Sequence, residues 1–175
     1  MTKINVCILG AKGVGKSSLF RSLSPKTSEK RIDKIRAGDI HEISLKEGKH
    51  DQLSYWLVST WEKRTFRNIR KLTLTNETLF IIVLDINRSV KDNKISYWVR
   101  NLSRRFPKAE ILPVISHIDV SETSKGLLRT KDKRKMESLF RKHGEKILPT
   151  IKVSNENGEN ISEVRNVLQE KLSDL

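Results

Sequence analysis

The sequence is poor in cysteine, in long apolar runs and in closely spaced metal ligands. Its single cysteine, Cys7, excludes an internal disulfide framework and favours a reducing, cytoplasmic environment. No stretch approaches the roughly 18 apolar residues of a transmembrane helix, and the N-terminus has no signal-peptide pattern. The four histidines lie far apart, so we expect neither a zinc nor an iron site. A soluble protein without a redox or structural-metal role is the expectation.

Apolar strand patterns alternate with helical patterns along the chain, which predicts a mostly parallel α/β sheet. The strand patterns occupy residues 4–9, 39–45, 53–58, 78–84, 111–115 and 147–153. The second and third predict a β-hairpin around residues 46–49, and the almost wholly apolar fourth predicts a central strand buried on both faces. No linker or repeat divides the 175 residues, so we expect one domain over residues 1–175.

A glycine-rich segment, GAKGVGKS, directly follows the first predicted strand and matches the pattern GxxxxGK[ST]. Its glycines let backbone N–H groups form a nest for a phosphate, and the following helix points its positive end there. Lys16 is expected to reach the β- and γ-phosphates, and Ser17 to offer its hydroxyl to Mg²⁺. An ordinary glycine-rich turn would not need Lys16. The predicted phosphate-binding residues are Gly10, Lys12, Gly13, Val14, Gly15, Lys16, Ser17 and Ser18.

Two later loops have the composition of a guanine site. Each follows a predicted strand, at the edge where open α/β sheets bind ligands: ISHID at residues 115–119 and VSNENG at residues 153–158. The carboxylate of Asp119 can accept hydrogen bonds from both the ring N–H and the exocyclic amine of guanine, whereas adenine matches it poorly. Backbone N–H groups of the second loop can face the guanine carbonyl. Either loop alone would also suit an ordinary turn, but their order after the phosphate loop favours a guanine nucleotide.

Together with FIIVLDINRS at residues 80–89, these motifs resemble the Ras-like small GTPases, and most of all their Roc (Ras of complex proteins) and Rab branch, over essentially the whole chain. The resemblance implies a P-loop NTPase fold with a mostly parallel six-stranded sheet flanked by helices, and GTP or GDP with Mg²⁺ as ligands. It also implies that Asp119 recognises guanine, that His117 packs beside the nucleotide, and that Ser154 and Asn155 belong to the second guanine loop. Asp85 becomes a turn residue rather than a metal ligand.

The resemblance is incomplete in the base motifs. SHID differs from the family pattern [NT]KxD because Ser116 replaces asparagine or threonine and His117 replaces lysine, although Roc-type domains use THxD. The family writes SAK where this chain has Ser154 followed by Asn155 and Glu156.

The resemblance fails at the catalytic switches. Family members carry WDxxGxE here, and a water-orienting glutamine usually follows the glycine. This chain reads WLVSTWEK instead, so Leu57, Thr60 and Trp61 stand at the aspartate, glycine and glutamine positions. Lys34 stands where the family has a Mg²⁺-binding threonine, with Thr27 or Ser28 as substitutes if the loop is shifted. We therefore expect slow or impaired GTP hydrolysis.

Two functions remain open. The first is a guanine-nucleotide-binding regulatory protein of the Ras-like type, and the alternative is a pseudo-GTPase scaffold that acts through its basic surface. A P-loop kinase or ATPase is disfavoured because the third predicted strand does not end in an acidic residue.

The formal charge of +14 is compatible with a plain solvated surface, and it also suggests an anionic partner. Basic residues cluster at residues 63–71, 100–108 and 125–135. An acidic protein or effector and an anionic membrane surface are the candidate partners. Nucleic acid is less favoured, because no cluster has the aromatic and glycine pattern of an RNA-binding module.

Overall fold

A six-stranded sheet in the order β2-β3-β1-β4-β5-β6 forms the centre of the computed structural model, which describes residues 2–23, 40–47, 51–58, 78–120, 130–141 and 146–173. The strands are β1 (Thr2–Leu9), β2 (Ile40–Glu47), β3 (Asp51–Val58), β4 (Leu79–Asp85), β5 (Ile111–Ser116) and β6 (Ile151–Lys152). The helices are α1 (Lys16–Leu23), α3 (Ile95–Arg105), α4 (Thr130–Arg141) and α5 (Ile161–Ser173), with a short 3₁₀ turn η1 (Ile118–Val120). The predicted mostly parallel fold is confirmed.

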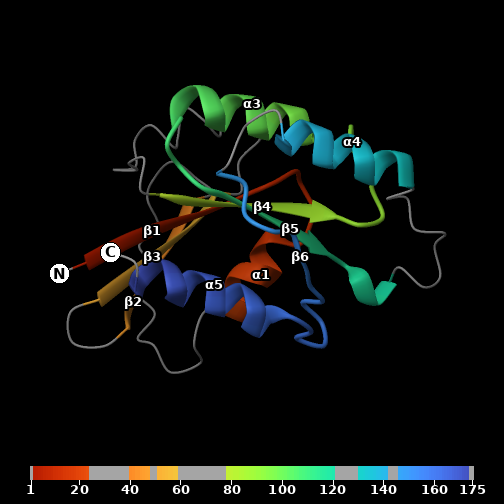
Figure 1. Ribbon diagram of the computed structural model, residues 1–175. Coiled ribbons are helices and arrows are strands. Elements are labelled where there is room, and N and C mark those ends of the chain that lie inside the picture. The colour runs from red at the N-terminus through yellow and green to blue at the C-terminus, as the bar shows by residue number, and fades with distance from the viewer. Residues whose placement is uncertain are drawn as a thin grey trace.

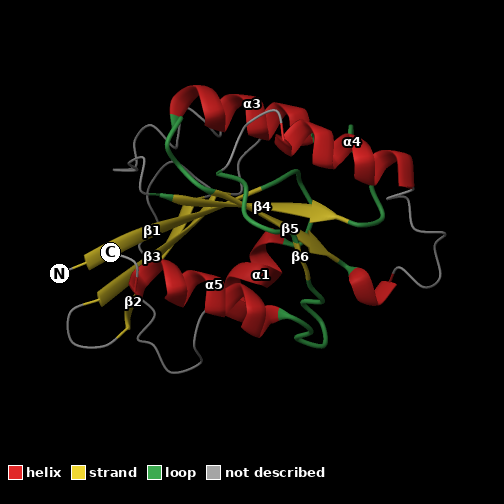
Figure 2. Cartoon of the chain, viewed as in Figure 1, coloured by secondary structure: helices red, strands yellow, loops and turns green. Residues whose placement is uncertain are grey.

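Helices cover both faces of the sheet. Figure 1 places α3 and α4 on one face and α1 and α5 on the other, and Figure 2 shows the strands between these two layers. Each face has its own apolar core. Leu19 and Phe20 of α1 pack with Val164 of α5 on one side, and Trp98 of α3 packs with Phe140 of α4 on the other. None of the helices in the described segments is long and apolar enough to cross a bilayer.

β4 lies at the centre, as its apolar sequence predicts, and all of its residues are buried. It pairs in parallel with β1 and β5, and β1 pairs in parallel with β3. The predicted hairpin is formed by the antiparallel pair β2 and β3. Its first strand runs to Glu47, so the predicted turn at residues 46–49 begins later than expected, and residues 48–50 lie outside the described segments.

The last strand is much shorter than predicted. Residues 147–153 were expected to form one strand, but only Ile151 and Lys152 do so, with an isolated bridge between Ile147 and Ile111. Pro149 lies between the two pairings and has no N–H to donate to the ladder. Ile147 pairs with Ile111 and Ile151 pairs with Val114, so the outer segment holds one more residue than β5 does over the same stretch. The proline and the extra residue interrupt the strand.

Helix α3 shows how the helical spacing positions the core. Ile95, Trp98, Val99 and Leu102 recur on one stripe and are buried, whereas Arg104 and Arg105 in the last turn are exposed. The helix ends at Arg105, shortly before Pro107, because a proline disfavours helical backbone in the residue before it. Because β1, β4, β5 and β6 are parallel, the loops that follow them meet at one edge of the sheet. The candidate site lies there.

Candidate functional site

The phosphate loop connects β1 to α1 through three glycines with positive φ angles. Gly10 has φ 151°, Gly13 has φ 78° and Gly15 has φ 92°. A Cβ atom on Gly10 would lie 2.5 Å from the carbonyl oxygen of Val83 in β4, so the loop passes directly over the central strand. The amide of Leu19 donates to the carbonyl of Gly15 at 2.9 Å and opens α1 at the end of the loop. Only glycine fits the first of these positions without displacing the sheet.

Lys16 is folded back into its own loop. Its Nζ donates to the carbonyl oxygens of Gly10 at 2.9 Å and Ala11 at 2.6 Å, and the residue is 7% exposed. A buried ammonium group needs such acceptors, because burial without them would be costly. The lysine therefore places a positive charge inside the loop. Ser17 is exposed in the first turn of α1, where its hydroxyl suits a metal ion, and Lys12 is exposed on the loop itself.

The first base loop is attached to the phosphate loop. Ser116, at the end of β5, is fully buried, and its Oγ lies 2.6 Å from the carbonyl oxygen of Val14 and 3.0 Å from that of Leu84. The chain then turns at His117, whose φ of 62° is unusual for a residue other than glycine. This turn leads into η1, which carries the partly exposed Asp119. The order of strands in the sheet thus brings two motifs about a hundred residues apart into direct contact.

The second base loop is organised around Ser154 and reaches Asp119. Ser154 is fully buried, its Oγ accepts from the amide of Asn157 at 3.3 Å, and its carbonyl accepts from the amide of Gly158 at 3.1 Å. The Ser154 hydroxyl also hydrogen-bonds to Asp119, and this is the main reason that the pKa of Asp119 lies below its ordinary value; desolvation opposes it more weakly. Asp119 is therefore held as a carboxylate. The two predicted guanine loops lie side by side.

Asn155, the other predicted residue of this loop, lies beneath the phosphate loop. A Cβ atom on Gly15 would be 3.2 Å from Asn155 Nδ2, 3.4 Å from Ser116 Oγ and 3.5 Å from His117 Nε2. Both polar atoms of the Asn155 amide are buried without a hydrogen-bond partner. Polar groups from the end of β5 and from the loops after β5 and β6 thus converge at Gly15, which is typical of a ligand site.

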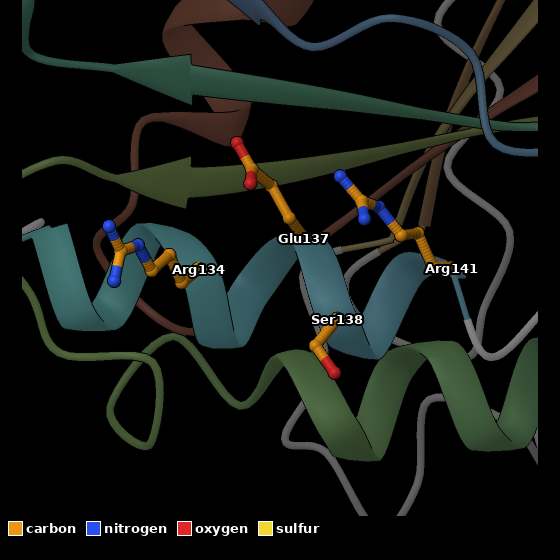
Figure 3. A pocket seen from close by; sticks show the side chains of 4 residues that line it. All are labelled: Arg134, Glu137, Ser138 and Arg141. Carbon is orange, nitrogen blue, oxygen red and sulfur yellow. The ribbon is translucent and has the colours of Figure 1, made fainter.

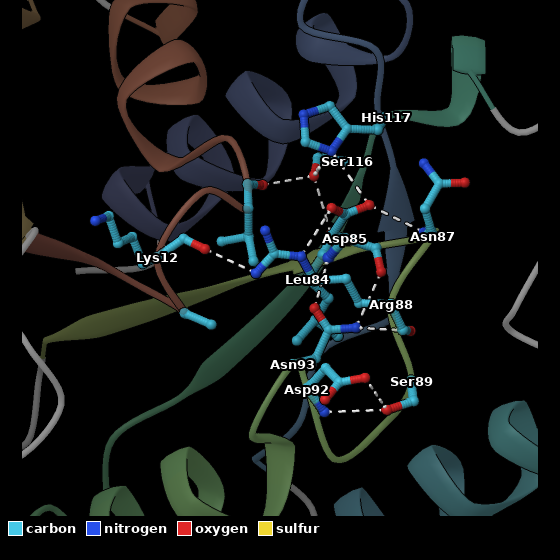
Figure 4. Close-up of polar contacts among 12 residues, drawn as sticks. Lys12, Leu84, Asp85, Asn87, Arg88, Ser89, Asp92, Asn93, Ser116 and His117 are labelled. Carbon is cyan, nitrogen blue, oxygen red and sulfur yellow. Dashed lines mark hydrogen bonds and ion pairs between the residues drawn. The ribbon is translucent and has the colours of Figure 1, made fainter.

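A polar network around Asp85, at the end of β4, was missed by the sequence reasoning (Figure 4). Its carboxylate contacts Arg88 Nε at 3.2 Å and His117 Nδ1 at 3.2 Å, and Arg88 Nη1 donates to the Lys12 carbonyl at 2.7 Å. Because a carboxylate only accepts, a hydrogen bond in this contact requires the form of His117 with a proton on Nδ1. Asp85 was predicted to be a turn residue, yet it connects the first base loop to the phosphate loop.

The backbone of Asp85 is itself fixed by a buried amide. Its N–H donates to Asn93 Oδ1 at 2.7 Å, and Asn93 Nδ2 donates back to its carbonyl at 2.9 Å. Asn93 is 1% exposed. The sequence feature that could have revealed this network is an aspartate and an arginine three residues apart at the end of a buried strand.

Several predicted residues lie elsewhere or outside the described segments. Leu57 lies in β3, in register with Ile8 of β1. Thr60, Trp61, Lys34, Thr27, Ser28 and the basic cluster at residues 63–71 fall outside the described segments. Residues 125–129 of the cluster at residues 125–135 do too, whereas residues 130–135 begin α4. Across the described ranges, no group of three or more His, Cys, Asp or Glu side chains could hold a metal ion.

Several of the exposed basic residues lie at α3 and α4, away from the loops of the candidate site. Arg100, Arg104 and Lys108 are exposed at the end of α3. A hollow on α4 is lined by Arg134, Glu137, Ser138 and Arg141 (Figure 3). All four of its residues come from one helix, and none belongs to the phosphate or base loops. This hollow is therefore separate from the site at the sheet edge.

Comparison with known proteins agrees with this geometry. The family model "Ras of Complex, Roc, domain of DAPkinase" matches residues 5–119. The Ras-related protein Rab-5B of Plasmodium falciparum (isolate 3D7) is 29% identical over 118 residues, 66% of this chain and 56% of that protein. The structure of Methanosarcina barkeri Roco2 RocCORdC bound to GDP superposes with a TM-score of 0.62 at 20% sequence identity. The superposition covers 100% of this chain and 50% of the Roco2 chain.

This chain therefore spans about half the length of both relatives, and the Roco2 likeness at that level of identity concerns the fold. The Roc model covers well over half of the chain, including the phosphate loop and Asp119. Because the match and the geometry agree, this protein belongs to the Roc family of Ras-like GTP-binding domains.

Proposed function

We propose that the domain is a regulatory protein that binds GDP and GTP at the edge of the sheet and hydrolyses GTP slowly. The observation that carries the proposal is the joining of three motifs: Ser116 contacts the phosphate loop at Val14, and Ser154 contacts Asp119. The protein's own contacts thereby hold the glycine-rich loop and the Asp119 carboxylate in one assembly. Such pre-organisation favours binding, because little ordering is left to be done when the ligand arrives.

Guanine selectivity is assigned to Asp119. Its carboxylate accepts from N1–H and the exocyclic amine of guanine, while adenine presents a ring acceptor at the same edge and would be repelled. The neighbouring loop of Ser154 and Asn155 supplies backbone N–H groups for the guanine carbonyl, and His117 packs beside the nucleotide.

The phosphates are assigned to the loop from Gly10 to Ser18. Its backbone amides and the Lys16 ammonium supply positive charge, and Lys16 exchanges its contacts with the Gly10 and Ala11 carbonyls for phosphate oxygens. Mg²⁺ would bind the Ser17 hydroxyl together with phosphate oxygens and water, as this ion commonly does at nucleotide sites.

Slow hydrolysis follows from the third strand. Leu57 lies near the end of β3, at the position where the family has the aspartate that holds Mg²⁺ through water, and an aliphatic side chain cannot do this. Thr60 and Trp61, at the glycine and glutamine positions, lack the groups that bind the γ-phosphate and orient water. Ras alone hydrolyses GTP at about 3–5 × 10⁻⁴ s⁻¹ with those groups present. We expect a rate below this value.

The alternative is a pseudo-GTPase scaffold that acts through its basic surface. It is favoured by the exposed arginines at the end of α3 and by the formal charge of +14, which suit an acidic protein or an anionic membrane better than nucleic acid. In this case the phosphate loop would support the fold rather than bind nucleotide.

The two functions are separated by titrating nucleotide-stripped protein with GDP, GTP and ATP, once in Mg²⁺ and once in a chelator. Regulatory binding predicts tight, guanine-selective association that depends weakly on Mg²⁺. The scaffold predicts no binding at near-millimolar nucleotide. The Asp119→Asn variant is the matched control, because an amide can donate to the 2-oxo group of xanthine and should shift preference from GDP towards xanthosine diphosphate.

Hydrolysis is tested separately by single-turnover assays on the GTP complex. A rate equal to that of Ras alone would refute the impaired-hydrolysis part of the proposal while leaving nucleotide binding intact.

A further inference from the structure

The hydroxyl of Ser116 is already committed to the protein. It lies within hydrogen-bond distance of two backbone carbonyls, those of Val14 and Leu84, and it has a single hydrogen to donate. The residue is fully buried. Ser116 therefore fastens the base loop to the phosphate loop and has no donor left for a ligand.

The amide of Asn155 is in the opposite situation. Its Nδ2 and Oδ1 atoms are buried and have no hydrogen-bond partner. Buried amides in native proteins are nearly always paired, so an orphan amide of this kind calls for a missing partner. Its Nδ2 lies 3.2 Å from the Cβ position of Gly15, a point also approached by Ser116 Oγ and His117 Nε2. The missing partner is thus expected where the two base loops meet the phosphate loop.

We propose that the side-chain amide of Asn155 reads the base of the bound nucleotide by donating a hydrogen bond from Nδ2 to N7 of guanine. This rests on the proposed guanine-nucleotide function and adds a side-chain contact to it. Guanine offers two acceptors on one edge, O6 and N7. Asp119 takes the donors on the opposite side of the ring, and backbone N–H groups of the Ser154 loop face O6. N7 is the acceptor that remains.

The position of Asn155 allows this contact. Its Nδ2 atom lies near the Cβ position of Gly15 together with atoms of Ser116 and His117, so a base bound between the phosphate loop and the two base loops comes within its reach. Adenine also has N7, so Asn155 raises affinity for purine nucleotides in general. Discrimination between guanine and adenine stays with Asp119. The two residues therefore have separable effects.

The test compares GDP with 7-deaza-GDP, in which a C–H group replaces N7. The wild-type protein is expected to bind 7-deaza-GDP about tenfold more weakly than GDP, the effect of one hydrogen bond. The Asn155→Ala variant is expected to bind both ligands equally, with GDP weakened about tenfold. Its preference for GDP over ADP should be unchanged, whereas a general disruption of the loop would also reduce this preference.

Asn157→Ala is the matched control, because it removes the same side chain from an exposed position of the same loop. It should retain the tenfold difference between the two ligands. Equal binding of GDP and 7-deaza-GDP by the wild type, or a full difference in Asn155→Ala, would overturn the assignment while the guanine site stands. If the wild type binds no GDP at all, the proposed function fails, and this assignment fails with it.

Discussion

Substituting Gly10 by alanine should destabilise the protein far more than the same change at Gly158. Gly10 has φ 151°, a backbone conformation that is essentially restricted to glycine, and a Cβ there would lie 2.5 Å from the Val83 carbonyl oxygen and 2.9 Å from Val14 Cγ2. The conformational strain costs about 1–3 kcal/mol. Forcing a methyl group against a central strand costs about 1–3 kcal/mol more. The free energy of unfolding should fall by roughly 2–6 kcal/mol in total, a large part of the about 5–15 kcal/mol that stabilises a typical domain.

Gly158 provides the matched comparison because it has strain without a clash. Its φ is 79°, and a Cβ there would meet nothing within 4 Å. Gly158→Ala should therefore cost only about 1–2 kcal/mol. Equilibrium unfolding in urea, without nucleotide, measures both values on the same scale. If Gly10→Ala were no more destabilising than Gly158→Ala, the close passage of the phosphate loop over β4 would be wrong.

Three further predictions concern the site and the core. Arg88→Ala should speed GDP release about three- to tenfold, because the partly exposed guanidinium no longer connects the Lys12 carbonyl to Asp85. The release rate of a fluorescent GDP analogue measures this effect, and an unchanged rate would contradict it. Because the Ser154 hydroxyl lowers the pKa of Asp119, the stabilisation from this contact is present above the ordinary aspartate pKa of about 4 and is lost as the pH falls through the lower folded-state pKa. GDP affinity measured against pH should thus weaken on the acid side, and Ser154→Ala should move this acid limb to higher pH; an acid limb that does not move would contradict the contact. Burial raises the pKa of the Cys7 thiol, so iodoacetamide should label it only as the protein unfolds; complete labelling of native protein at about pH 8 would show that β1 is not buried.

The fold was predictable because its signals are local and repeated. The apolar run of β4 predicts a strand buried on both faces, which is confirmed, and the apolar residues of α3 recur at helical spacing and are buried. The length of β6 was not predictable in the same way. Ile147 and Val153 look like ends of a single strand, but Pro149 interrupts the pairing with β5, and the register change appears only when the two segments are side by side.

The site was predictable as motifs but not as a network. The glycine pattern and Asp119 could be read from spacing, since each carries its chemistry within a few residues. The contact between Arg88 and the Lys12 carbonyl spans 76 positions along the chain, and it depends on β4 lying beside β1. The orphan amide of Asn155 is likewise visible only in three dimensions, because burial and the absence of a partner are properties of packing.

Two contacts that hold the phosphate loop come from one side of the site, and Leu57, at the aspartate position of the family motif, lies on the other. Ser116 ends β5 and donates to the Val14 carbonyl, and Arg88 follows β4 and donates to the Lys12 carbonyl. Leu57 belongs to β3, on the opposite flank of β1, at the start of the segment that should support the γ-phosphate. Because these two contacts use no group from β3, loss of the switch residues need not loosen the loop at Val14 and Lys12. Binding and hydrolysis can therefore be lost separately, which is why a tight nucleotide complex and a very slow GTPase are expected in the same protein.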